Sequence, residues 1–139
     1  MKKIFYFRGT PPTTKIASLR HTLGTKDSQQ IKKKTEKTKE KIGWIKDGAG
    51  SRFDQLELEL PAYFTTITNE ATSVRESMAA NFGLSVEELN EYPHALIGST
   101  EEICEILEQR REEYGFSYIS VNERHLEEFA PVVAKLSGK

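Results

Sequence analysis

Two strand-like segments, separated by about 50 residues of mainly helical pattern, constrain the fold of this chain more than any other feature. In residues 55–60, three leucines alternate with glutamine and glutamate, a period typical of a strand with one apolar face. Pro61 interrupts this strand, so a continuation through residues 63–67 requires a bulge or a sheet edge. Residues 116–121 combine aromatic and β-branched residues with two serines, which indicates a largely buried strand. Because a long helical connection joins them, we expect the two strands to be parallel neighbours.

Helical patterns are expected over most of the remaining sequence. Residues 27–50 carry apolar or threonine side chains at steps of three and four, which is the period of an α-helix. Two capping boxes, Ser85–Glu88 and Ser99–Glu102, each predict the start of a further helix, because the serine and the glutamate satisfy each other's free amides. The expected helices are residues 27–50, 69–82, 85–92, 99–114 and 126–136. The sequence therefore predicts an α/β fold.

The first part of the chain is the least regular. Residues 3–7 could form a short buried strand that ends at Gly9, whereas residues 15–23 show no firm period. We therefore divide the chain into an irregular N-terminal segment, residues 1–26, and an α/β segment, residues 27–139. A length of 139 residues suits one small domain.

Charge is distributed unevenly along the chain. Residues 1–50 carry 13 Lys or Arg against 4 Asp or Glu, and residues 51–139 carry 7 against 17. Six lysines fall within ten residues, at positions 32, 33, 34, 37, 39 and 41. Such a run could bind the phosphates of RNA or DNA. A solvated helix face is favoured, because Glu36 and Glu40 lie at helical spacing from lysines and only Trp44 supplies an aromatic neighbour.

Several classes of protein are disfavoured by what the sequence lacks. Cys104 is the one cysteine, which excludes a disulfide framework and a cysteine zinc site. Its glutamate neighbours predict an inert thiol, and no histidine spacing predicts a metal site. The longest apolar runs fall far short of the roughly 20 residues of a membrane span, and no export signal is recognised. We expect a cytoplasmic protein that contacts no membrane.

Several segments of the chain resemble luciferase-like flavin- and deazaflavin-dependent oxidoreductases, the monooxygenase family of that name. The resembling segments are Lys41–Leu58, Phe82–Leu89, Pro93–Ile103, Tyr114–Val121 and Glu127–Leu136. They follow the family's order over about residues 40–139, whereas residues 1–22 do not resemble the family. The family fold is a (β/α)8 barrel, or TIM barrel, of roughly 250 residues. The resemblance thus implies a partial (β/α)8 barrel that comprises its last two strand–helix units, preceded by a lysine-rich helix.

The resemblance also implies a function. In the family, reduced FMN or a deazaflavin coenzyme carries out redox chemistry on a small-molecule substrate, while the protein positions the cofactor. Because most positioning loops of the family are missing, we expect this chain to be inactive alone and assign it no catalytic residue. We expect it to self-associate or to complete a barrel with a partner chain. The alternative is a small nucleic-acid-binding protein that uses the Lys32–Lys41 helix.

Three residues are candidates for cofactor binding through the same resemblance. His94 is expected in a loop between two helices, where it could lie over a flavin-like ring; the alternative is a turn histidine that packs locally. Gly98 and Ser99 precede a helix, and free amides at a helix N-terminus can bind phosphate. The alternative there is an ordinary N-cap, which Glu101 and Glu102 favour because they would repel a phosphate.

Overall fold

The computed structural model describes residues 6–7, 15–18 and 28–139 of the chain. In this part the helices are α1 (Ser28–Ala49), α2 (Ala71–Phe82), α3 (Val86–Glu91), α4 (Thr100–Tyr114) and α5 (Leu126–Leu136). The strands are β1 (Tyr6–Phe7), β2 (Lys15–Ser18), β3 (Leu56–Ala62), β4 (Phe64–Ile67), β5 (Ala95–Gly98) and β6 (Phe116–Val121). Short 3-10 helices at Gly50–Gln55 and Glu123–His125 precede β3 and α5. None of the described helices is long and apolar enough to span a bilayer.

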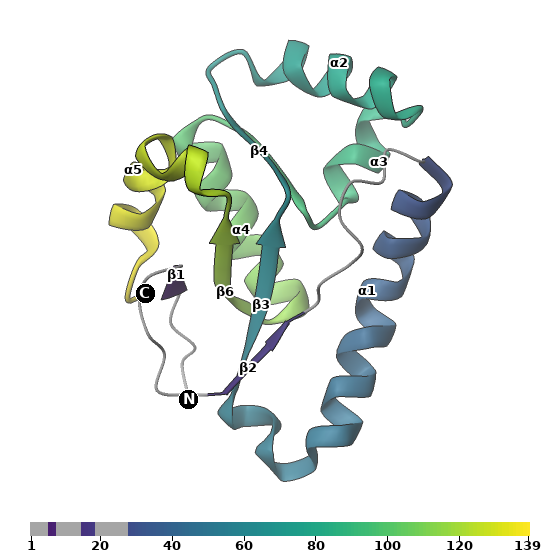
Figure 1. Ribbon diagram of the computed structural model, residues 1–139, viewed down its shortest axis with the longest axis vertical. Coiled ribbons are helices and arrows are strands. Elements are labelled where there is room, and N and C mark those ends of the chain that lie inside the picture. The colour runs from purple at the N-terminus through teal and green to yellow at the C-terminus, as the bar shows by residue number, and fades with distance from the viewer. Residues whose placement is uncertain (1–5, 8–14, 19–27) are drawn as a thin grey trace.

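A four-stranded parallel sheet in the order β1-β6-β3-β2 is the centre of the fold (Figure 1). Its two inner strands, β3 and β6, pair in parallel, with Leu60 opposite Ile119. The prediction that residues 55–60 and 116–121 are adjacent parallel strands is therefore confirmed. The pairing register shifts between Leu58 and Glu59, which places an irregularity inside the sheet. The described strands do not close into a barrel.

A second, two-stranded parallel sheet continues from the first. The chain bends at Tyr63, and β4 then pairs in parallel with β5. The expectation that Pro61 interrupts the strand is wrong, because β3 runs through Pro61 to Ala62 with Pro61 opposite Ser120. Among the described strands, the pairing of β3 with β2 ends at Glu59, so Pro61 lies where that side of β3 is an edge. The expectation that residues 93–98 form only a loop between two helices is wrong, because Ala95–Gly98 is a strand. Its four residues are all buried, and a run this short carries no readable period.

Two described strands belong to the segment expected to be irregular. β1 lies within the predicted strand of residues 3–7, of which residues 3–5 lie outside the described part of the chain. β2 was not predicted, because its four residues have no distinctive pattern and pair with the edge of β3. The described parts of residues 1–26 therefore contribute both edge strands of the larger sheet.

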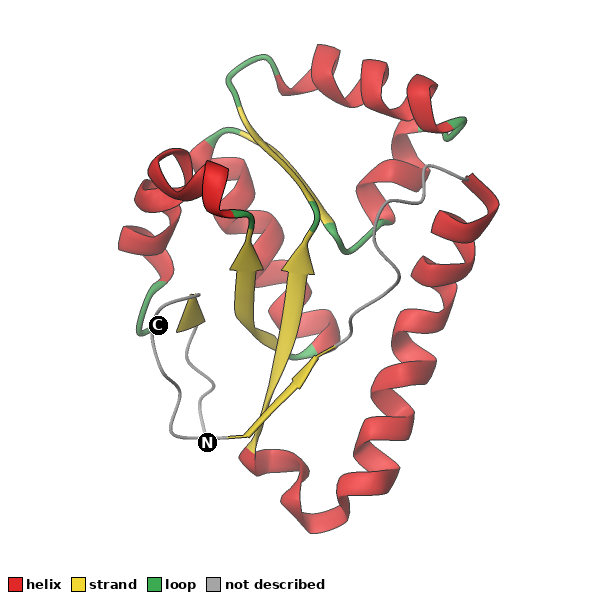
Figure 2. Ribbon diagram, in the orientation of Figure 1, coloured by secondary structure: helices red, strands yellow, loops and turns green. Residues whose placement is uncertain are grey.

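The helices lie around the strands (Figure 2), and two clusters of apolar side chains hold them there. In the first cluster, leucines 58 and 60 of β3 pack with Phe116 and Ile119 of β6 against α4 and α5. In the second, Ile31 of α1 packs with residues of α2, α3 and β5, among them Leu89. Ile42 and Ile45 of α1 pack against the first cluster. The threonine-containing stripe predicted for residues 27–50 is thus the inner face of α1, and it joins both clusters.

Candidate functional site

The second face of β3 is buried like the first. Glu57 and Glu59 alternate with the leucines of the apolar cluster and so lie on the opposite face of the sheet. Their exposed fractions are only 8% and 5%. The alternation predicted one apolar face and made no prediction for the other, which is covered as is normal for an inner strand of a parallel sheet.

Each buried carboxylate accepts a hydrogen bond from a serine of β6. The hydroxyl of Ser117, which is fully buried, donates to Oε2 of Glu57. The hydroxyl of Ser120 donates to Oε1 of Glu59 at 2.7 Å. A charged group taken from water without such a donor would cost several kcal/mol. The carboxylates and hydroxyls of these four residues, here called the polar sheet face, are therefore held together as two matched pairs.

His94 lies beside the carboxyl end of β3 and links the two sheets. Its Nδ1 is 2.7 Å from the carbonyl oxygen of Pro61, and because a carbonyl only accepts, Nδ1 carries the proton and donates. The ring is 1% exposed, stacks on Tyr63 at 5.0 Å and meets the edge of Tyr92 at 5.3 Å. Burial, with a smaller contribution from Tyr63, raises the pKa of Tyr92 to about 12. His94 thus packs locally in a buried aromatic group, which is the alternative to a loop residue over a flavin.

Gly98 lies where a side chain would not fit. A Cβ at this position would be 2.9 Å from Cβ of Glu102 and 3.2 Å from Nη2 of Arg75. The carbonyl oxygen of Gly98 accepts a hydrogen bond from the amide of Thr68 at 2.9 Å. A glycine is required here by the close approach of α4 to the end of β5.

Ser99 caps α4, and both predicted capping boxes are present. Its hydroxyl accepts from the amide of Glu102 at 3.2 Å, and its own amide donates to Oε2 of Glu102 at 2.8 Å. The hydrogen bond from the Ser99 amide is the main reason that the pKa of Glu102 lies below its ordinary value. A carboxylate therefore occupies the helix N-terminus where a phosphate would have to bind, and these contacts do not fit the phosphate of a flavin.

Three of the seven lysines of α1 form ion pairs with carboxylates of the described residues. The ion pairs are Lys32–Glu88 at 2.8 Å, Lys37–Glu40 at 2.9 Å and Lys39–Glu113 at 3.2 Å. Trp44 is 57% exposed, and the ammonium of Lys37 lies 5.9 Å from its ring centre. Two of the three pairs join α1 to α3 and α4, so these lysines also fasten the helix to the rest of the fold.

Cys104 is 8% exposed, and burial raises the pKa of its thiol above the ordinary value. A protonated, buried thiol is a poor nucleophile. Within the described residues, no three His, Cys, Asp or Glu side chains gather in a way that could hold a metal ion.

The polar sheet face could have been anticipated from a signal that was not used. Residues 116–121 were expected to be buried, and their two serines are the only hydroxyls in that strand besides Tyr118. Glutamates on a neighbouring strand supply the acceptors that buried serines need. Pairing the two strands by hydrogen-bonding capacity, and not only by apolar pattern, would have predicted that Glu57 and Glu59 are buried.

Comparison of the chain with protein-family models, with curated proteins and with solved structures found no match in any of the three. The site is therefore interpreted from its own geometry.

Proposed function

We propose that the chain supplies the last two strand–helix units of a luciferase-like (β/α)8 oxidoreductase, whose FMN or deazaflavin coenzyme acts on a small organic substrate. The observation that carries the proposal is the strand order of the larger sheet. In a closed parallel barrel the last strand pairs with the first. Here β6, the last of the described strands, pairs in parallel with β1, the first of them, and its other neighbour is β3. An arc of a barrel across its closure would have the order β2-β3-β6-β1, which supports the proposal.

The two faces of this arc support the same proposal. Barrel enzymes carry their helices outside and fill the inside with side chains. One face of the sheet packs against α4 and α5, and the polar sheet face lies opposite. In a completed barrel Glu57 and Glu59 would point inward, where hydrogen-bonding groups can orient a bound molecule.

The cofactor itself is not expected to bind to this chain alone. His94 is enclosed by aromatic rings, and Ser99 and Glu102 satisfy each other at the start of α4. A flavin or deazaflavin, when bound, supplies hydride transfer. The part proposed for this chain is to form one wall of the cavity that would hold it, and we assign none of its residues a chemical step.

Complementation tests this proposal. The chain is co-expressed with the second to fifth strand–helix units of a luciferase-like oxidoreductase, because β1 and β2 already occupy the places next to β6 and β3. FMN and the deazaflavin coenzyme are titrated while fluorescence is followed. We expect a complex of one copy of each, measured by light scattering, that binds one of the cofactors although neither part does so alone. Failure to form the complex would overturn the proposal, as would a monomer of this chain that binds either cofactor at micromolar concentration.

A matched pair of variants separates the inner face of the sheet from its outside. Glu59→Gln removes one of the two carboxylates of the polar sheet face, and Glu105→Gln makes the same change on the exposed side of α4. We expect Glu59→Gln to weaken cofactor binding by the complex and Glu105→Gln to leave it unchanged. Equal effects would show that the polar sheet face does not line the cofactor cavity.

Nucleic-acid binding by α1 is the second candidate function, and the exposed Trp44 beside Lys37 is the observation that favours it, because bases stack on exposed aromatic rings. It ranks below the first because three lysines of the run are already paired with glutamates.

A further inference from the structure

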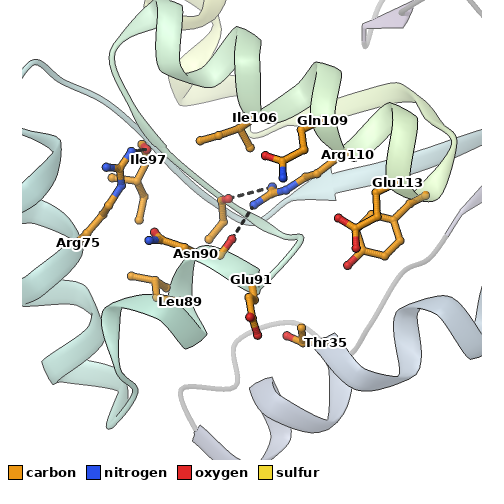
Figure 3. A pocket seen from close by; sticks show the side chains of 12 residues that line it. Thr35, Arg75, Leu89, Asn90, Glu91, Ile97, Ile106, Gln109, Arg110 and Glu113 are labelled. Atoms are coloured by element: carbon orange, nitrogen blue, oxygen red, sulfur yellow. Dashed lines mark hydrogen bonds between the residues drawn. The ribbon is translucent and has the colours of Figure 1, made fainter.

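A cavity of about 600 Å³ lies between β5 and the helices α1, α2, α3 and α4 (Figure 3). Its volume is in the range of pockets that bind small molecules. Leu89, Ala95 and Ile97 are buried in its wall, and Ile106 adds a half-buried apolar side chain. The cavity lies on the helical side of the fold, away from the polar sheet face, so it is not accounted for by the proposed cofactor site.

Arg110 places a fixed positive charge in the wall of this cavity. Its side chain is 7% exposed, and its Nη atoms donate to four backbone carbonyls at the end of α3 and the start of β5. The acceptors are Pro93 at 2.6 Å, Ala95 at 3.0 Å, Tyr92 at 3.2 Å and Asn90 at 3.5 Å. Within the described residues no carboxylate forms a salt bridge with Arg110. Burial lowers the pKa of Arg110 to about 10, so the guanidinium remains charged at neutral pH.

A second guanidinium lines the same cavity from α2. Nη2 of Arg75 donates to the carbonyl oxygen of Ile97 at 2.7 Å and lies 3.5 Å from Glu102. This anchoring holds the Arg75 side chain, which is 18% exposed, against the apolar wall (Figure 3). Arginine recognises carboxylates and phosphates through several donors in a rigid plane.

The acidic residues of the cavity lie in its exposed rim. Glu91 and Glu113 are exposed, and Glu113 is already paired with Lys39 of α1. Figure 3 shows Glu113 on the side opposite to Arg75 and Ile97. Exposed charges are weakened by solvent and salt, whereas a buried charge acts through a medium of lower dielectric constant. Arg75 forms a salt bridge with Glu102, so Arg110, which has no salt bridge among the described residues, is the main positive charge beside the apolar wall.

We propose that this cavity binds a small organic anion, with its carboxylate or phosphate head group toward Arg75 and Arg110 and its apolar body against Leu89, Ile97 and Ile106. Asn90 and Gln109, both exposed at the rim, supply amide groups that can hydrogen-bond the part of the ligand nearest to solvent. Among the described carboxylates, Glu113 acts on Arg110 from the exposed rim without forming a salt bridge with it, so a bound anion would add a counter-charge on the buried side of the cavity.

Amide chemical shifts of the isotope-labelled chain test the proposal, with three probes. The probes are 4-phenylbutyrate, 4-phenylbutyl phosphate and the neutral 4-phenylbutanamide. We expect saturable shifts at Ile97, Ile106 and Arg110 with at least one anion, and binding at least about tenfold weaker for the amide, because it lacks the charge-assisted contact. The anion that binds more tightly identifies the head group. The proposal would be overturned if the amide bound as tightly as the anions or if the shifts were confined to other residues. It would also be overturned if no shift saturated up to 10 mM, a concentration that corresponds to a binding free energy of about −3 kcal/mol.

Variants of residues inside and outside the cavity distinguish a loss of the binding site from a loss of the fold. Arg75→Gln is expected to weaken binding of the anion by about tenfold, whereas Arg111→Gln, the same change at the residue that follows Arg110 and lines no part of the cavity, leaves it unchanged. Ile106→Trp fills the cavity and is expected to abolish binding while the spectrum stays that of a folded chain. Unchanged affinity in Arg75→Gln or in Ile106→Trp would refute the assigned position of the ligand.

Discussion

The buried pair formed by Glu57 and Ser117 gives a test of whether the polar sheet face is held by matched hydrogen bonds. Ser117→Ala removes the donor and leaves a carboxylate that is 8% exposed without it. A hydrogen bond to a charged group contributes about 1.5–3 kcal/mol, and a buried charged group left unsatisfied costs at least as much. We therefore expect Ser117→Ala to lower the free energy of unfolding by about 2–3 kcal/mol.

A double-mutant cycle separates the interaction energy of Glu57 with Ser117 from the effect of each substitution on the surrounding packing. Glu57→Leu alone leaves a buried serine hydroxyl without its acceptor and is expected to cost about 1 kcal/mol. The double variant removes both polar groups, and replacing a buried pair by apolar groups is often close to neutral. The single effects should therefore not add, and the coupling energy should be about 3–4 kcal/mol.

Urea unfolding of the four proteins measures this coupling, provided that the denaturant slope stays constant across them. Ser120→Ala is the matched control, because Ser120 is only half-buried and Glu59 has contacts besides it. Its cost should be about 1 kcal/mol, since water can replace the lost hydroxyl. Additive effects of Ser117→Ala and Glu57→Leu, within about 0.5 kcal/mol, would refute the view that the polar sheet face consists of matched pairs.

Three further predictions concern a glycine, a tyrosine and the lysines of α1. Gly98→Ala should destabilise the protein by about 1–3 kcal/mol, because the added Cβ would clash with Glu102. Gly43→Ala should stabilise it by about 0.5–1 kcal/mol, because a Cβ added at this position of α1 has no neighbouring atom within 4 Å. Thermal unfolding of both variants checks the two predictions. The fold favours the neutral form of Tyr92, so its contribution is complete below pH 10 and is lost as the pH rises toward 12. Between pH 10 and 12, the free energy of unfolding should therefore fall by up to about 2 kcal/mol more in the wild type than in Tyr92→Phe. Parallel curves of unfolding free energy against pH would contradict this prediction. RNA or DNA should bind only weakly and without sequence preference, with affinity falling between low and moderate salt by about a decade for every two or so lysines engaged. Tight, selective binding at physiological salt would instead favour the second candidate function.

The features that could be predicted from the sequence are those that neighbouring residues determine. The capping boxes at Ser85 and Ser99 were predictable because each closes within one turn of helix. The parallel pairing of β3 with β6 was predictable because both strands are strongly patterned and helices connect them. The strands that were missed, β2 and β5, have four residues each and owe their conformation to a partner strand. Their position depends on tertiary pairing, which a local pattern does not contain.

The residues that matter most for the proposals are charged residues at positions where the pattern calls for burial. Arg110 follows Ile103 and Leu107 on the inward stripe of α4, at the spacing that elsewhere in that helix carries apolar side chains. The burial of Glu57 and Glu59 was not predicted, because alternation distinguishes two faces of a strand but does not say whether the second face is covered. In both places a charged residue is visible in the sequence at a position of the apolar pattern or beside it, but only the packing of the structure shows that this residue is buried.

These two anomalies point to different requirements. Each carboxylate of the polar sheet face accepts a hydrogen bond from a serine of β6, which satisfies one acceptor but leaves the negative charge in place. Among the described groups, Arg110 is held by carbonyl dipoles, which orient the guanidinium without cancelling its charge, and Glu113 is its charged neighbour at the rim. The opposite charges do not meet, because Arg110 binds the segment between α3 and β5 while the glutamates bind β6. A partner that completes the sheet would therefore leave the charge of Arg110 as it is, and the anion proposed for the helical cavity would leave the edges of the sheet open. The two sites thus need two different molecules.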